Sequence, residues 1–232
     1  IGIRTSVIPS AYGEGIVMRI LNPKITKVKF ESLGIEPKLF EILDHENKKP
    51  NGLMLITGPT GSGKTTTLYS FLRRIYNPEI KIITIEDPIE YHLAGITQTQ
   101  TESDKGYNFA AGLRAAMRQD PDVVMVGEIR DGETAQLAIQ AALTGHLVFS
   151  TIHTNNAQGV IPRLIDLGIN PKILTSALTI SVAQRLVRIL CTNCKSERIA
   201  NEKETELFKK IISEAVEEGK DMKSYGVEVQ DS

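Results

Sequence analysis

The segment that most constrains this chain is Gly58 to Thr65, which reads GPTGSGKT. It matches the pattern G-x-x-x-x-G-K-[ST], follows the apolar run 53–57 and precedes 66–76, which has the pattern of a helix. In that context glycines let backbone N–H groups turn toward a phosphate, and the helix N-terminus adds positive potential there. The segment predicts a site for nucleotide phosphates, with a Gly-rich connecting turn as the alternative.

We expect the loop and the residue after it to contact the nucleotide, and the expected set is Gly58, Pro59, Thr60, Gly61, Ser62, Gly63, Lys64, Thr65 and Thr66. The ammonium of Lys64 would reach the β- and γ-phosphates. The hydroxyl of Thr65 would bind Mg²⁺, which neutralises charge as the γ-phosphoryl group departs. ATP and Mg²⁺ are therefore the predicted ligand and cofactor.

Four apolar runs alternate with helical patterns at intervals of about 30 residues, which is typical of βαβ units. The runs are 53–57, 80–85, 123–126 and 147–150. We predict an α/β fold with a mainly parallel, twisted sheet flanked by helices. Each run ends in polar residues, and parallel strands place their carboxyl ends at one edge, so four polar clusters should converge there.

Four segments are expected along the chain. Residues 1–22 contain two short β runs, 3–8 and 16–21, and are interpreted as the hairpin remnant of an amino-terminal α+β domain, because a lone hairpin is marginal in water. Residues 23–50 form a linker and a first helix, and 51–190 form the core. Residues 191–232 form a carboxy-terminal appendage with an apolar helical stripe.

Glu128 follows the run 123–126 and should lie at a strand tip facing the γ-phosphate. A carboxylate there can orient or deprotonate the attacking water. The alternative is a helix cap, but Asp131 is the better candidate for the cap because it opens the Ala-rich pattern that ends at Leu143. Glu128 is therefore the predicted catalytic carboxylate.

A second acidic cluster follows the second run and contains Glu86, Asp87 and Glu90. Three carboxylates together suggest the positioning of Mg²⁺, directly or through a water, and a solvated loop is the alternative. His153 follows the fourth run and is a candidate γ-phosphate sensor, although a lone histidine is more often structural.

Arg4 and Arg19 lie on the two runs of the expected hairpin. Arginines that reach phosphate from a separate element stabilise transition-state charge. Most arginines only solvate surfaces, so a surface role is the alternative.

Composition excludes several classes of protein. With 27 basic and 28 acidic side chains, the net charge of −1 predicts no nucleic-acid partner. No stretch approaches the roughly 18 apolar residues of a spanning helix, so we expect a soluble, intracellular protein. Cys191 and Cys194 are the only cysteines, which fits a reducing compartment. Because the chain opens on Ile without Met, we expect a fragment of a longer protein.

From Arg4 to Lys195 the chain resembles the ATPases of type II secretion and type IV pilus assembly, the GspE-like group. The matching motifs are the Gly58–Thr65 loop, an acidic "Asp box" at 84–91, the run 113–122 leading into 127–131, the segment 144–148, and a "His box" around His153. Segments 95–100 and 183–188 look more like the assembly and secretion motors than the pilus-retraction motors.

The resemblance implies a RecA-like P-loop core that hydrolyses ATP with Mg²⁺ and works as a homo-hexamer powering protein secretion or pilus assembly. It implies that Glu128 is the catalytic carboxylate and that Glu86 and His153 belong to the active centre. Arg4 and Arg19 match arginines of an amino-terminal domain that approach the γ-phosphate. Cytoplasmic location and partners in an inner-membrane platform are also implied.

One feature departs from the pattern of the family. Secretion and assembly ATPases often carry two C-x-x-C pairs that bind zinc; Cys191 and Cys194 match the first pair, and no second pair follows. Four thiolates close a structural zinc site, whereas two leave it half built. Either a second pair lies beyond residue 232 or zinc is absent, and two unligated thiols are the simplest interpretation.

Three other functions compete with a secretion motor. A guanine-nucleotide switch is disfavoured because no D-x-x-G or N-K-x-D motif occurs. A hexameric helicase or recombinase would share the core, but neutral charge and few aromatic residues count against a nucleic-acid channel. A catalytically silent assembly scaffold should lack an intact Lys64, Thr65 and Glu128, and all three are present.

Overall fold

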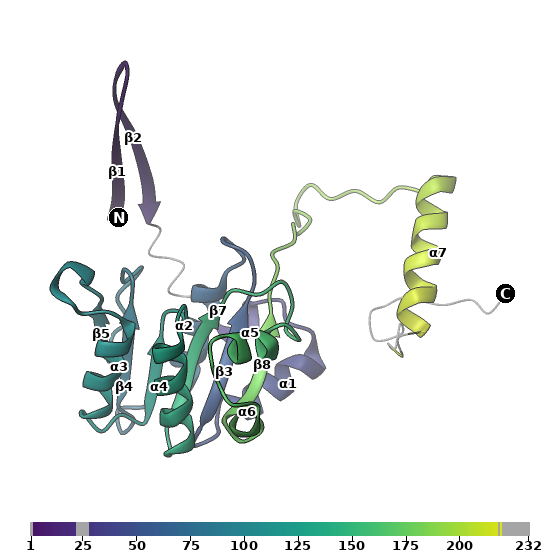
Figure 1. Cartoon of the computed structure of the whole chain (residues 1–232). Coiled ribbons are helices and arrows are strands. Elements are labelled where there is room, and N and C mark those ends of the chain that lie inside the picture. Colours follow the sequence, from purple (N-terminus) through teal and green to yellow (C-terminus); the bar gives the residue numbers. More distant parts are fainter. Residues whose placement is uncertain (1, 22–27, 218, 220–232) are drawn as a thin grey trace. The chain divides into compact units, whose positions relative to one another are not determined.

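The computed structural model describes residues 2–21, 28–217 and 219 (Figure 1). The chain divides into two compact units, Ile1–Leu186 and Val187–Ser232, and each is described by itself. The larger unit contains a six-stranded sheet and a separate two-stranded hairpin.

The six-stranded sheet is parallel throughout, with the order β5-β4-β6-β7-β3-β8. Its strands are β3 (Gly52–Thr57), β4 (Ile82–Glu86), β5 (Thr97–Gln100), β6 (Val123–Val126), β7 (Leu147–Ile152) and β8 (Leu178–Ala183). Every residue of β3, β4, β6 and β7 is buried, which explains why these strands appear in the sequence as continuous apolar runs. The predicted parallel sheet is confirmed.

Helices cover both faces of the sheet, so the core has three layers (Figure 1). On one face lie α3 (Phe109–Met117), α4 (Gly132–Leu143), α5 (Val160–Asp166) and α6 (Pro171–Ala177); on the other lie α1 (Pro37–Glu46), α2 (Lys64–Ile75) and the short 3₁₀ turn η2 (Phe30–Ser32). Along β3, Leu53 and Leu55 belong to the first core, whereas Met54 and Ile56 belong to the second. The alternation follows from the two-residue period of a strand.

The first residues of helices α4 and α2 show how the loops before them end. Asp131 caps α4, because its side chain accepts a hydrogen bond from the backbone N–H of Thr134 at 2.8 Å. This is the cap that the sequence predicts, and it leaves Glu128 free for another role. Helix α2 begins at Lys64, two residues earlier than the pattern 66–76 indicates. Its N-cap is Gly63, which has no side chain to occupy the N–H groups of the first turn.

The hairpin consists of β1 (Gly2–Ser10) and β2 (Gly13–Leu21), paired antiparallel through a tight turn. Both predicted β runs are therefore strands. Apolar side chains point outward from it, including Ile3, Val7, Ile16 and Met18, all of which are exposed. An exposed apolar hairpin of this kind fits the interpretation as part of a larger domain, which stays a prediction.

The smaller unit contains one described helix, α7 (Glu202–Glu217). Leu207, Phe208, Ile211 and Val216 are each about half exposed on it, in the apolar spacing that the sequence indicates. Within the part of the chain that the structure describes, no helix has the length and apolar character needed to cross a membrane. The boundaries of the four expected segments stay predictions.

Candidate nucleotide-binding site

The predicted phosphate loop joins β3 to α2 and has the backbone of a tight cradle. Gly58, Gly61 and Gly63 have φ values of 147°, 77° and 86°, a region that side chains other than glycine rarely adopt. A Cβ on Gly58 would also collide with the carbonyl oxygen of Gln184. Glycine is therefore required at these positions, and the loop ends directly in the uncapped N–H groups of α2, which attract an anion.

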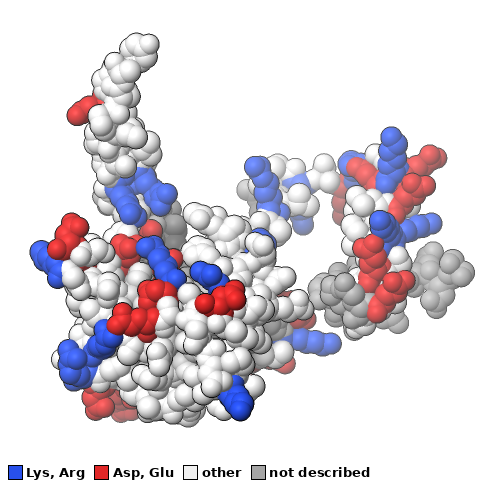
Figure 2. Space-filling model, in the orientation of Figure 1, with Lys and Arg blue, Asp and Glu red and all other residues white. Residues whose placement is uncertain are grey.

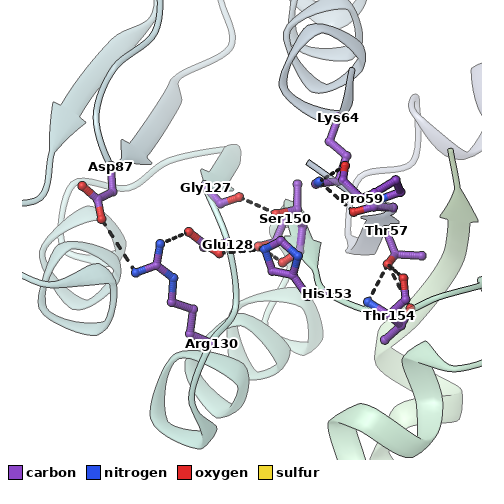
Figure 3. A network of polar contacts seen from close by, with 12 residues as sticks. Thr57, Pro59, Lys64, Asp87, Gly127, Glu128, Arg130, Ser150, His153 and Thr154 are labelled. Atoms are coloured by element: carbon purple, nitrogen blue, oxygen red, sulfur yellow. Dashed lines mark hydrogen bonds and ion pairs between the residues drawn. The ribbon is translucent and has the colours of Figure 1, made fainter. Parts of the chain in front are cut away.

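The side chain of Lys64, near the end of the loop, reaches back to the first residues of the loop. Its ammonium donates hydrogen bonds to the carbonyl oxygens of Gly58 at 2.9 Å and Pro59 at 3.0 Å (Figure 3). Partial burial lowers the pKa of Lys64, the carboxylate of Glu128 opposes that shift, and the charge of Arg185 adds to it. A partly desolvated cation beside a nest of N–H groups favours binding of a multiply charged anion.

Glu128 lies two residues beyond the last residue of β6 and is held from two sides (Figure 3). Its Oε1 accepts a hydrogen bond from Arg130, and its Oε2 lies 3.2 Å from Nε2 of His153. Burial raises the pKa of Glu128, but the hydrogen bonds and charges of Arg130 and His153 outweigh burial, so the net pKa is lowered. The carboxylate is therefore ionised and fixed in direction, as required for orienting water.

Arg130 also faces Asp87, whose Oδ2 lies 3.9 Å from its Nη1. The guanidinium thus lies between two carboxylates, and both raise the pKa of Arg130. Asp87 remains half exposed at the end of β4. Arg130 is a residue to which the sequence analysis gives no role; the signal available was a cation two positions after the predicted catalytic carboxylate.

Glu86 is almost fully buried, with 3% of its surface exposed. Its carboxylate accepts hydrogen bonds from the hydroxyl of Thr84 at 2.6 Å, from the amide of Gln98 at 3.0 Å and from the phenol of Tyr69. Burial, together with the adjacent carboxylate, raises the pKa of Tyr69 well above its usual value, so the phenol stays protonated and donates. Glu86 thereby links α2, β4 and β5.

Glu86, Asp87 and Glu90 line one cleft, but they differ in exposure. Glu86 is buried and its charge is balanced by interior hydrogen-bond donors, whereas Asp87 is half exposed. Within residues 2–21, 28–217 and 219, no group of three or more His, Cys, Asp or Glu side chains is arranged to hold a metal ion. A magnesium contact through Asp87 and Thr65 stays a prediction.

Hydroxyl side chains at the strand ends support the backbone around the site. The hydroxyl of Thr57 accepts hydrogen bonds from the backbone N–H and the hydroxyl of Thr154, both at 2.9 Å. The same hydroxyl of Thr57 donates to the backbone carbonyl of Thr154 at 2.8 Å. Thr151 donates to the carbonyl of Gly127 at 2.8 Å, and Ser150 donates to the carbonyl of Val126 at 2.7 Å. These bonds fix the tip of β6 against β7, so the position of Glu128 is determined by the sheet.

The predicted convergence of polar clusters is present. One cleft is lined by residues of the phosphate loop and by side chains from the ends of β4, β6 and β7, namely Lys64, Thr65, Thr66, Glu86, Asp87, Glu90, Glu128 and His153. Figure 2 shows Lys and Arg interspersed with Asp and Glu on the face of the molecule that it presents. The arrangement provides a local cationic loop opposite a fixed carboxylate.

Arg4 and Arg19 are direct partners across the hairpin register. Like charges opposite each other on paired strands repel, and a shared anion relieves the repulsion. The hairpin therefore places Arg4 and Arg19 side by side. The chain between the hairpin and residue 28 lies outside the described residues, so their approach to the nucleotide stays a prediction.

Cys191 and Cys194 are both free and exposed. The backbone N–H of Lys195 donates to the carbonyl of Cys191 at 3.0 Å, which closes the turn between the cysteines. Hydrogen bonds from Asn193 and Cys194 lower the pKa of Cys191. Because the described residues supply no third or fourth ligand, the structure gives zinc no support.

Residues 1–227 match the family described as "Type II/IV secretion system protein". Among curated relatives, "Type II secretion system protein E" of Pseudomonas aeruginosa is 53% identical over 208 residues, covering 90% of this chain and 41% of the relative. "Type II secretion system ATPase E" of Vibrio cholerae is 50% identical over 208 residues, covering 90% and 41%. The chain thus spans about two fifths of the length of these relatives.

Solved structures agree with this assignment. The pilus retraction motor PilT with bound ADP has a TM-score of 0.68 and 40% identity, covering 80% of this chain and 55% of that chain. The Legionella pneumophila ATPase DotB has a TM-score of 0.63 and 29% identity, covering 80% and 53%. The VirB11 ATPase of Brucella suis, at 19% identity and a TM-score of 0.54, shares the fold. Together with the match over 1–227, these likenesses show that the chain belongs to the Type II/IV secretion system protein family.

Proposed function

We propose that this chain binds ATP with Mg²⁺ and hydrolyses it, as the motor domain of a type II secretion or type IV pilus assembly ATPase. The observation that carries the proposal is the fixed, ionised carboxylate of Glu128 in the same cleft as the cationic phosphate loop. The printed names of the relatives, which include a secretion ATPase and a pilus motor with bound ADP, support it.

The phosphate loop binds the nucleotide. Backbone N–H groups of the loop and of the first turn of α2 hold the phosphates, and the ammonium of Lys64 leaves the carbonyls of Gly58 and Pro59 to contact the β- and γ-phosphates. The hydroxyl of Thr65 and the nearby carboxylate of Asp87 are oxygen donors of the kind that Mg²⁺ prefers, and both line the cleft. Bound Mg²⁺ neutralises charge on the β- and γ-phosphate oxygens.

Glu128 accepts a hydrogen bond from the attacking water and so orients it. Arg130 and His153 hold the two carboxylate oxygens of Glu128 in place. His153, at the end of β7, is positioned to respond to the γ-phosphate because it contacts the same carboxylate. Glu86 contributes indirectly, since it connects α2 to the end of β4 through Tyr69.

The coupling to mechanical work belongs to the same proposal. ATP on one subunit of a homo-hexamer draws the hairpin-bearing domain inward through Arg4 and Arg19, and hydrolysis releases it. The facing pair of arginines supports this idea, because it concentrates positive charge at one point of the hairpin. The partners would be platform proteins of the inner membrane, and the location would be the cytoplasm.

The test is ATP turnover by the purified chain. Lys64→Ala and Glu128→Gln should each lower kcat by at least about 100-fold, the first by loss of phosphate contact and the second by loss of the water-orienting carboxylate. Glu133→Gln is the matched control, because Glu133 is exposed and pairs with Arg114. Unchanged turnover in both site variants would leave a nucleotide-binding scaffold as the better interpretation.

A helicase-like or recombinase-like ATPase is the remaining alternative. It would bind single-stranded DNA tightly and with a dependence on its length, because each basic contact releases counterions. An electrophoretic shift assay with oligonucleotides of increasing length should show no such binding by this chain. A length-dependent shift would favour the alternative.

A further inference from the structure

The two residues that follow β8, Gln184 and Arg185, lie against the phosphate loop. The backbone N–H of Gln184 donates to the carbonyl of Thr57 at 2.9 Å, and Thr57 is the last residue of β3. The ladder between β3 and β8 therefore continues up to the residue where the phosphate loop begins.

The side chain of Gln184 reaches the helix on the other side of the loop. Its Oε1 accepts a hydrogen bond from the hydroxyl of Thr67 at 2.9 Å. Thr67 is buried in the first turn of α2, three residues after Lys64. Gln184 thus connects the strand before the loop, through its backbone N–H, with the helix after the loop, through its side chain.

Gln184 also occupies the space beside two of the loop glycines. A Cβ on Gly58 would collide with its carbonyl oxygen, and a Cβ on Gly63 would lie 3.0 Å from its Nε2. The loop backbone therefore lies directly on Gln184 at both ends of the cradle. A change in that side chain alters the surface on which the loop is packed.

Arg185 holds Gln184 in this position. Its guanidinium donates to the carbonyl of Gln184 at 2.9 Å and to the carbonyl of Asn155 at 2.6 Å. Asn155 follows β7, so the loop after β7 and the end of β8 are joined by one side chain. Gln184 is in this way also fixed through its backbone carbonyl, next to Gly58 of the phosphate loop.

From these contacts we infer that Gln184 is a positioning residue for nucleotide binding, acting through Thr67 and the backbone of the phosphate loop. The inference rests on the proposed function, because it assumes that the loop holds a nucleotide. Its consequence is that the bond between Gln184 and Thr67 contributes to nucleotide affinity as well as to folding.

The experiment measures the Kd for Mg-ADP by isothermal titration calorimetry on the whole chain. Gln184→Met removes the acceptor with little change of shape, and Thr67→Val removes the donor from the other side. Each should weaken binding about fivefold, the effect of one hydrogen bond. The double variant should bind no more weakly than the single variants, because both changes remove the same bond.

Thr179→Val is the matched control. It removes a hydrogen bond of 3.1 Å from Thr179 to the carbonyl of Leu53, at the far end of β8 from the loop. It should lower the melting temperature and leave the Kd unchanged. If Gln184→Met and Thr67→Val also leave the Kd unchanged while the wild type binds, the inference is wrong and the proposed function stands. Fully additive losses in the double variant would also overturn it. A wild type without affinity for Mg-ADP would overturn both.

Discussion

At the scale of single residues, two acids separated by three positions have different tasks. Asp131 accepts a hydrogen bond from the backbone N–H of Thr134 at the start of α4, whereas Glu128 is held by the side chains of Arg130 and His153 in the cleft. The difference follows from the partners of each carboxylate: the N–H and hydroxyl of Thr134 for Asp131, and Arg130 and His153 for Glu128. Only the second carboxylate lines the cleft beside the phosphate loop, where it can contact a water molecule next to a bound nucleotide.

Removing Arg130 should change the pH dependence of hydrolysis. Arg130 lowers the pKa of Glu128, so Arg130→Ala should raise that pKa. Activity that needs ionised Glu128 is present above its pKa and lost as pH falls through it, so the acidic limb of kcat/KM should move to higher pH. The measurement is a pH–rate profile at saturating Mg²⁺, with Arg163→Ala, an exposed arginine of α5, as the control. An unmoved acidic limb would show that Arg130 does not tune Glu128.

Tyr69→Phe tests the buried contact to Glu86. The variant keeps the ring and deletes the donor, which leaves Oε2 of Glu86 without the phenol hydrogen bond that it has in the native protein. We expect the free energy of unfolding to fall by about 1–3 kcal/mol, as measured by urea denaturation. Tyr12→Phe, at the fully exposed tip of the hairpin, should have no measurable effect.

At the scale of elements, the strands differ in how well their sequence predicts them. The four buried strands are continuous apolar runs and are predicted within two residues. β5 reads TQTQ, and two of its side chains make hydrogen bonds, Gln98 with Glu86 and Thr99 with Tyr107. β8 forms the other edge and is only half buried. Edge strands lack the two-sided apolar pattern, so neither was predicted.

The same reasoning explains which parts of the site were predictable. The loop and Glu128 are specified by local spacing, so the sequence places them at strand ends. The burial of Glu86 depends on Tyr69 and Gln98, which come from elements 17 and 12 positions away. The role inferred for Gln184 depends on a bond to Thr67 across 117 positions. Contacts over such separations follow from strand order, which local patterns do not define.

The start of α4 gives a prediction at this scale. Asp131→Ala removes the hydrogen bond to the N–H of Thr134 and a second one to its hydroxyl at 3.1 Å. The free energy of unfolding should fall by about 1 kcal/mol. The melting temperature should therefore fall by about 2–4 °C. Asp104→Ala, which removes an exposed carboxylate from the turn η3 (Ser103–Lys105), is the control. Equal melting temperatures for the two variants would contradict a capping role.

At the scale of the whole molecule, the cleft links ligand binding to folding. A nucleotide that binds only the folded chain should stabilise it by about 2.7 kcal/mol at a concentration 100 times the Kd. For a domain of this size the melting temperature should rise by roughly 5–11 °C in differential scanning fluorimetry with Mg-ADP. Lys64→Ala should abolish most of that rise. The same rise in Lys64→Ala would mean that the nucleotide binds elsewhere.

β3, which carries the phosphate loop, is hydrogen-bonded on both sides, to β7 and to β8. Its amides are therefore enclosed by two neighbours, and solvent reaches them only when the sheet itself comes apart. Deuterium uptake should be slow along this strand and fast along the polar strand β5, which has a single neighbour. In the proposed motor, the loop can rearrange in every cycle while the strand beneath it stays as closed to solvent as the other interior strands β4, β6 and β7.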